Sequence, residues 1–206
     1  KDPTKKVAVL SIDPSSEISQ GSILGDKTRM NKLSSMSAAY IRPSSSGNNL
    51  GGVSKNTRLA VLLCEAAGYN TILIESVGVC QNETEIAKLS DLFVLLISPG
   101  GGDELQGIKR GIMEVADIVV VNKADGNNKN QATITAKEYS MALHLKPKNE
   151  NNWVPKVIVA SAQEKQGIQL FIEKCTDFNN HIKNRWKLKH RKQQMKYWII
   201  YIYKTK

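Results

Sequence analysis

The stretch Ile118-Val-Val-Val-Asn-Lys-Ala-Asp125 decides the fold class, because an apolar run of strand length ends directly in a polar turn. Consecutive β-branched residues are typical of a strand that is buried on both faces of a parallel sheet. Ligands of such sheets bind at the carboxyl ends of the strands. The tetrapeptide Asn122–Asp125 therefore stands where a binding site is expected.

The chemistry of this turn points to guanine. The Asp125 carboxylate can accept the adjacent N1–H and N2–H donors of guanine together, and adenine lacks this paired edge. We expect Asn122 to bond the other edge of the base and the stem of Lys123 to cover its face. A Ser161-Ala162 turn follows the next apolar run and offers backbone N–H groups to guanine O6. Each motif alone is also an ordinary polar turn, but their order along the chain favours guanine recognition.

Further apolar runs predict parallel strands at Val7–Ile12, Thr71–Ile74, Leu92–Ile97 and Val157–Ala160. Helical spacing predicts helices at Leu59–Ala66, Glu83–Ser90, about Gln106–Ala116, about Thr133–Leu143 and Gly167–Asn180. This alternation predicts an α/β fold with a doubly wound, mostly parallel sheet. The polar Gly/Ser-rich stretch 43–58 is expected to be a mobile functional loop.

Three acidic residues at or near strand ends are candidate Mg²⁺ ligands. Asp13 and Glu75 end predicted strands, and Asp26 lies in a loop. Hard oxygen ligands of this kind suit Mg²⁺, which also takes waters and substrate phosphates. Gly78 lets a backbone N–H approach a γ-phosphate, so we place Glu75 and Gly78 beside the reacting phosphate and water. Taken singly, each acid is also an ordinary cap or turn residue.

Glycines 100–102 precede a predicted helix and raise the possibility of an anion site. Asp103 and Glu104 would repel a phosphate there, so a flexible switch-like loop is the better interpretation.

The net charge of +10 belongs to the end of the chain. Residues 178–206 contain nine Lys or Arg and no acid, which leaves 20 basic and 19 acidic residues before them. Such a basic tail with Trp residues can contact nucleic acid. We favour the other interpretation, a helix that packs one face on its own protein or on a partner. No apolar run approaches the roughly 18 residues of a membrane span. Cys64, Cys80 and Cys175 form no C-x-x-C pair, which argues against a zinc site or a disulfide framework in this protein. The same pattern indicates a reducing compartment.

Ordered strings across the chain carry a family resemblance. They are IDPSS, GSILGDKTRM, YIRPS, LGGVSKNTR, ILIESVGVCQNE and PGGGDELQGIKRGIMEVADIVVVNKADG. From about Lys5 to Ile172 the chain resembles the methylmalonyl-CoA-mutase-associated GTPases, the MeaB/ArgK family of P-loop GTPases. The resemblance implies a protein that binds GTP or GDP with Mg²⁺ and hydrolyses GTP. It also implies a chaperone that loads and protects adenosylcobalamin-dependent methylmalonyl-CoA mutase, in bacterial cytoplasm or mitochondrial matrix.

The resemblance also assigns roles to residues. Asp13, Asp26 and Glu75 match the Mg²⁺-site acids, and Asn122, Lys123 and Asp125 match the guanine-specificity motif. The stretch Gly100–Arg110, with Lys109, resembles the switch loop that couples nucleotide state to the mutase. Residues 1–180 are then an N-terminally incomplete GTPase domain. Residues 181–206 are a basic tail that serves as a dimerisation or partner segment, and the full-length protein is expected to be a homodimer.

One departure from the family pattern bears on activity. The sequence contains no G-x-x-x-x-G-K-[ST] loop, which would cradle the β-phosphate, and the strand that launches this loop is normally central in the sheet. Its absence would expose the edges of two neighbouring strands. The chain begins at Lys1 rather than Met, so we expect a fragment of a GTPase. The alternative is a non-catalytic relative that keeps only a partner-binding surface, and the genomic sequence upstream of Lys1 distinguishes the two.

Overall fold

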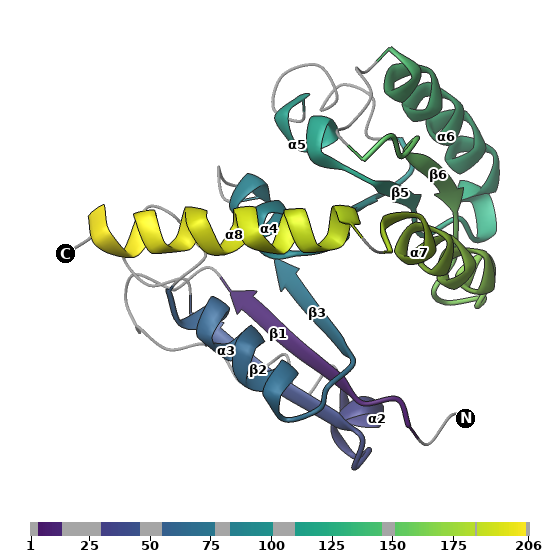
Figure 1. The fold of residues 1–206 in the computed structure, drawn as a ribbon. Coiled ribbons are helices and arrows are strands. Elements are labelled where there is room, and N and C mark those ends of the chain that lie inside the picture. The colour runs from purple at the N-terminus through teal and green to yellow at the C-terminus, as the bar shows by residue number, and fades with distance from the viewer. Residues whose placement is uncertain are drawn as a thin grey trace. The chain divides into compact units, whose positions relative to one another are not determined.

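The structure is a computed structural model that describes residues 4–13, 30–45, 55–76, 83–100, 110–145, 151–183 and 185–204. The chain divides into two compact units, Lys1–Leu89 and Ser90–Lys206. Each unit is an α/β assembly built on its own three-stranded parallel sheet (Figure 1).

In the first unit, β1 (Val7–Asp13) lies between β2 (Ala39–Ser45) and β3 (Thr71–Ser76). The unit also contains the helices α2 (Asn31–Ser34), α3 (Lys55–Ala66) and α4 (Glu83–Leu89). Helix α3 packs on one face of the sheet, where its buried residues Ala60, Val61 and Cys64 contact Ala8 and Leu10 of β1. Burial raises the pKa of the Cys64 thiol, while the nearby Arg42 lowers it by a smaller amount.

The second unit holds β4 (Val94–Ile97), β5 (Ile118–Val121) and β6 (Lys156–Val159), in that order across the sheet. Its other elements are α5 (Arg110–Val115), the 3-10 turn η2 (Gly126–Asn128), α6 (Lys129–His144), α7 (Ile168–Ile182) and α8 (Arg185–Lys204).

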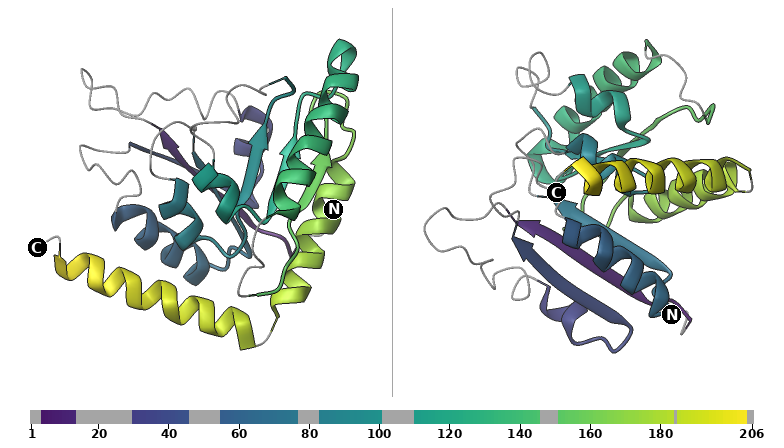
Figure 2. Two further views of the ribbon diagram at one scale, coloured as in Figure 1. Left: turned by 90° about the horizontal axis from the view of Figure 1, so that it is seen from above. Right: turned by 60° about the vertical axis from the view of Figure 1, so that its left-hand side comes forward.

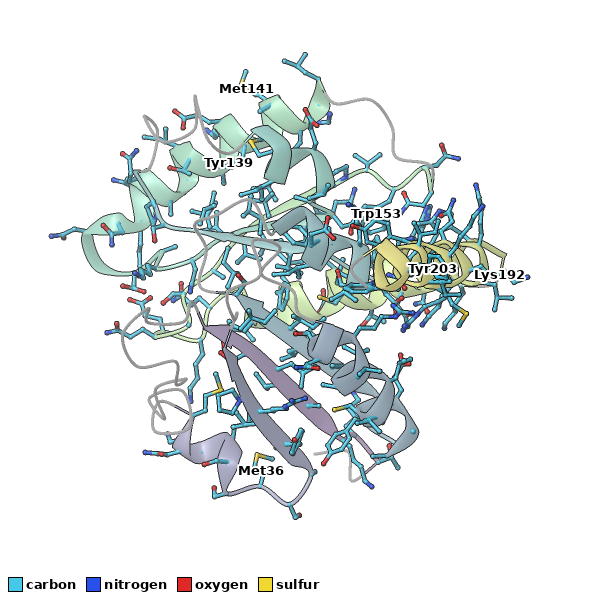
Figure 3. All side chains as sticks on the ribbon, turned by 90° about the vertical axis from the view of Figure 1, so that its left-hand side faces the viewer. Met36, Tyr139, Met141, Trp153, Lys192 and Tyr203 are labelled. Atoms are coloured by element: carbon cyan, nitrogen blue, oxygen red, sulfur yellow. The ribbon has the colours of Figure 1, made fainter. Side chains whose placement is uncertain are left out.

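The central strand β5 is buried on both faces, and this makes the second unit a three-layer structure (Figure 2). Val119 and Val121 pack in the cluster that contains Tyr139 of α6. Ile118 and Val120 face the opposite way and pack in the cluster that contains Phe171 of α7. Figure 3 shows Tyr139 on the inner side of α6, with the exposed Met141 on the outer side. The successive side chains of one strand therefore join two helical layers, as a doubly wound fold requires.

The predicted parallel strands and the α/β class are confirmed, with strand ends shifted by one or two residues. Strand β2 was not predicted, because Pro43 and Ser44 interrupt its apolar run. Proline cannot donate to a sheet ladder, and it is tolerated here because β2 is an outer strand of its sheet.

The prediction of a loop over 43–58 is wrong at both ends. Residues 43–45 complete β2, and residues 55–58 begin α3. The start of this helix is polar in sequence, yet Thr57 is only 2% exposed, so burial of the helix face overrides the loop-like composition. Residues 46–54 lie outside the described part of the chain.

Among the described residues, β3 and β4 each pair on one side only. Each carries an exposed apolar side chain, Leu73 at 52% and Leu96 at 64%. We expected this chain to lack the central strand that launches the phosphate-binding loop, and this expectation stays a prediction. Of the helices that the structure describes, none is long and apolar enough to cross a bilayer.

Candidate functional site

The two sequence motifs predicted to bind guanine lie side by side at the carboxyl ends of β5 and β6. Val121 and Val159 are register partners in these parallel strands, so the turns that follow them start at the same edge. The backbone N–H of Ala124 donates to the Ala160 carbonyl at 3.1 Å, and this bond joins the two turns directly.

A hydrogen-bond relay orients the Asp125 carboxylate. The Ser161 hydroxyl donates to Asp125 Oδ2 at 2.6 Å and accepts from the backbone N–H of Glu164 at 2.9 Å. Because Glu164 supplies the proton of its own bond, the single hydroxyl proton of Ser161 is directed to Asp125. Ser161 is fully buried, which makes this short bond to a carboxylate a strong positional constraint.

The Asn122 side chain braces the second turn. Its Oδ1 accepts the backbone N–H of Ala162 at 3.1 Å. The backbone N–H of Ser161 is also engaged, because it donates to the Gln166 carbonyl at 3.0 Å. Of the two N–H groups expected to face guanine O6, only that of Ala162 belongs to an exposed residue, so it is the one able to exchange its partner for a ligand.

The segment Ser161–Gln166 is closed into a compact loop, which the sequence analysis missed. Ser161 and Gln166 exchange backbone hydrogen bonds of 3.0 and 3.1 Å. Gly167 ends the loop with φ of +72°, and a Cβ atom there would lie 2.3 Å from the Val159 carbonyl oxygen. This close approach to the Val159 oxygen reserves position 167 for glycine. In the sequence, the only signal of this requirement is a glycine at the start of a predicted helix.

Two lysines border this site. Lys123 adopts φ of +60°, a conformation that is uncommon for residues other than glycine and that often marks a functional turn. Lys129, the first residue of α6, forms an ion pair of 3.0 Å with Glu164 in the Ser161–Gln166 loop. Their side chains are 52% and 34% exposed, so we expect this pair to contribute at most about 1 kcal/mol.

The predicted Mg²⁺ ligands belong to the first unit, as far as the structure describes them. Asp13 is the last residue of β1, and Glu75 is an exposed residue near the end of the adjacent β3, paired in register with Ser11. Both positions are at the carboxyl end of the sheet. Asp26, Gly78 and Lys109 lie outside the described residues, as does the side chain of Asp13. Among the side chains described, no group of three or more His, Cys, Asp or Glu could hold a metal ion.

The sequence profile of a GTPase family matches the whole chain. The profile, described as "Methylmalonyl Co-A mutase-associated GTPase MeaB", covers residues 1–206. Together with the α/β fold and the two strand-end motifs, this match shows that the chain belongs to the methylmalonyl-CoA-mutase-associated GTPase family.

Individual relatives agree. The chain is 48% identical over 195 residues to "GTPase ArgK" of Escherichia coli, covering 94% of the chain and 59% of that protein. It is 46% identical over 196 residues to "Methylmalonic aciduria type A homolog, mitochondrial" of Caenorhabditis elegans, covering 95% of the chain and 49% of that protein. The crystal structure of "LAO/AO transport system kinase" superimposes with a TM-score of 0.79 at 36% identity, over 98% of the chain and 58% of that structure. The chain thus spans about half the length of the curated relatives it matches.

Proposed function

We propose that the turns after β5 and β6 form the base site of a GTP-binding protein. The observation that carries the proposal is the Ser161–Asp125 bond of 2.6 Å, because it fixes the carboxylate that would accept N1–H and N2–H of guanine. Asn122 braces the site, the Lys123 stem covers the base, and the Ala162 N–H donates to O6. Ser161 acts through Asp125 rather than on the base.

The same proposal places the phosphate chemistry on the carboxyl end of β1 and β3. Asp13 and Glu75, with Asp26, supply the hard oxygen donors that fit Mg²⁺. When bound, the metal would neutralise charge on the β- and γ-phosphates. In this proposal Glu75 and Gly78 act near the γ-phosphate and the attacking water, and Lys109 belongs to the switch loop. The reaction would rest on positioning and charge stabilisation, without a covalent intermediate.

The cellular role we propose follows the relatives. The description of the family profile names methylmalonyl-CoA mutase, and the relatives include a bacterial and a mitochondrial protein. The full-length protein would be a GTP-dependent chaperone that serves this mutase during cobalamin loading and protects it. It would act as a homodimer in bacterial cytoplasm or mitochondrial matrix.

Base recognition is tested with nucleosides, which isolate the base from the phosphates. We expect ligand-detected NMR to show guanosine binding in the range of about 1 mM, with adenosine not bound. Asp125→Asn should weaken guanosine binding about tenfold, because one charge-assisted acceptor is lost. The same variant should gain xanthosine binding, since xanthine carries a carbonyl oxygen where guanine carries its exocyclic amine.

Glu138→Gln, an exposed charge change on the outer part of α6, is the matched control and should bind guanosine as the unaltered chain does. Equal binding of guanosine and adenosine would show that this turn is not the base site. An Asp125→Asn variant with an unchanged preference among the nucleosides would show the same.

Hydrolysis is a separate expectation. The chain alone should show no measurable GTPase activity, because no G-x-x-x-x-G-K-[ST] stretch in its sequence cradles the β-phosphate. Phosphate release is measured after two successive chromatographic steps, so that a contaminating enzyme is removed. Turnover that survives both steps and falls in Asp125→Ala would overturn this expectation.

A further inference from the structure

Lys129 occupies the first position of α6, where a positive charge is unfavourable. The N-terminus of a helix is the positive end of its dipole, so acidic side chains stabilise this position and a lysine does not. The first turn of α6 contains no acidic residue that would offset the charge. Any advantage of a lysine at position 129 therefore comes from a contact outside α6.

That contact joins the two turns of the proposed base site. Lys129 Nζ lies 3.0 Å from Glu164 Oε2, in the Ser161–Gln166 loop that follows β6. On its own side, Lys129 is connected to Asp125 through η2, and the Asn128 N–H closes this turn by donating to the Asp125 carbonyl at 2.9 Å. Among the described contacts between the two turns, this is the one between two oppositely charged side chains.

The backbone of Glu164 holds the hydroxyl that orients Asp125. Its N–H donates to Ser161 Oγ at 2.9 Å, and Ser161 Oγ donates to Asp125 Oδ2 at 2.6 Å. Through its side chain, the same Glu164 is bound to Lys129. Covalent and non-covalent links thus form a closed ring from Asp125 to Lys129, across to Glu164, and back through Ser161. A movement of Glu164 away from Lys129 would withdraw the N–H that leaves Asp125 as the acceptor of the Ser161 proton.

Backbone strain lies directly beside Glu164. Lys165 has φ of +58°, a left-handed conformation that costs free energy for a residue other than glycine. Both residues are exposed, so packing against neighbouring side chains does little to hold this part of the loop. The ion pair with Lys129 therefore restrains the loop at the position next to its strained residue.

We propose that Lys129 is a positioning residue of the base site, which raises the affinity for guanine nucleosides and nucleotides by holding Glu164 in place. The inference rests on the proposed function, because it assumes that Asp125 accepts the base. Lys129 acts through Glu164 and Ser161 and does not touch the base itself. Since the paired side chains are 52% and 34% exposed, we expect an effect of a few fold rather than a loss of binding.

Lys129→Ala should weaken guanosine binding about threefold without lowering the stability of the chain. The variant loses the ion pair, but alanine is a better helix former and removes the charge from the helix N-terminus. Ligand-detected NMR on the full 206-residue chain measures the dissociation constant, and thermal unfolding followed by circular dichroism measures stability. A residue with a purely structural role would lower affinity and stability together.

Salt supplies a second readout, because guanosine carries no charge. Its binding cannot weaken through screening of ligand phosphates, so a salt effect reports on charges of the protein. At about 1 M sodium chloride, where charges are screened beyond roughly 3 Å, the affinities of the unaltered chain and Lys129→Ala should differ by less than about twofold.

A charge exchange and a matched control complete the set of variants. Lys129→Glu alone should weaken binding at least as much as Lys129→Ala, because two carboxylates then face each other. Combining it with Glu164→Lys restores an ion pair and should bring the dissociation constant to within about twofold of the original. The control Lys174→Ala removes the same charge from another partly exposed ion pair, Lys174–Asp177 of 2.7 Å on α7, and should leave guanosine binding unchanged.

Amide exchange tests the positioning without any ligand. Solvent-exchange NMR of the free chain should show the Glu164 N–H exchanging about threefold faster in Lys129→Ala than in the unaltered chain, since its bond to Ser161 opens more often.

The outcomes separate this inference from the base site on which it rests. A chain that does not prefer guanosine to adenosine overturns the base site and the role of Lys129 with it. A chain that prefers guanosine, with an unchanged affinity or an unchanged Glu164 exchange rate in Lys129→Ala, overturns the role of Lys129 alone. A weakening that the charge exchange fails to reverse, or that comes with a loss of stability, also overturns that role.

Discussion

An alanine at position 167 is expected to abolish detectable guanosine binding while the second unit stays folded. Gly167 has φ of +72°, and an added Cβ would lie 2.3 Å from the Val159 carbonyl oxygen and 3.0 Å from Ala160 Cα. Both neighbours are backbone atoms at the end of β6, so no side-chain rotation relieves the contact. The backbone must shift, and the Ser161–Gln166 loop is the segment between the two points of contact.

The shift would reach the base site through the hydrogen bonds of that loop. Gln166 holds Ser161 by paired backbone bonds, and Ser161 orients Asp125. Since binding at this site rests on a few directed hydrogen bonds, displacement of the carboxylate by about 1 Å removes most of the interaction. Ligand-detected NMR with guanosine measures the loss, and circular dichroism reports the fold.

Gly126→Ala is the control for backbone strain alone. Gly126 also has a positive φ, of +50°, but nothing lies within 4 Å of the Cβ position. It should lower stability by about 1 to 2 kcal/mol and keep guanosine binding. If Gly167→Ala binds guanosine as well as Gly126→Ala does, the loop is not held by this close approach.

The base motif was predictable from sequence because each of its parts obeys a local rule. Ile118–Val121 is long and apolar enough to define a buried strand, and ligand sites of parallel sheets follow such strands. The bond between Ser161 and Asp125 joins residues 36 positions apart, so only the register of β5 and β6 brings them together. The sequence order suggested their proximity, but it carried no information on the relay through Glu164.

Other elements could not be predicted, for physical reasons. Strand β2 contains Pro43 and is stabilised by pairing with β1 rather than by its own composition. The requirement for Gly167 arises from the Val159 carbonyl, a contact that no local pattern encodes. The tail was correctly predicted as a helix with one packed face, but the contacts of Arg191 and Gln194 with Ser90 and Asp91 span about half the chain.

The second large effect is expected at the core of the second unit. Phe178 of α7 is 1% exposed, and its ring meets Trp153 edge-on, with centroids 5.2 Å apart. Trp153 donates its indole N–H to the Asp117 carbonyl at 3.0 Å. Phe178 therefore anchors α7 to the segment that leads into β6. Removing its ring leaves a cavity in a cluster that also contains Ile182.

Phe178→Ala should lower the free energy of unfolding of the second unit by about 3 to 5 kcal/mol, the range for deletion of a buried aromatic ring. Urea unfolding followed by tryptophan fluorescence measures the change. Leu170→Ala, at a 44% exposed position of the same helix, is the control and should cost less than about 1 kcal/mol. Because α7 begins directly after Gly167, loss of its anchor should also weaken guanosine binding before global unfolding. A Phe178→Ala protein as stable as Leu170→Ala would show that α7 is not anchored through Trp153.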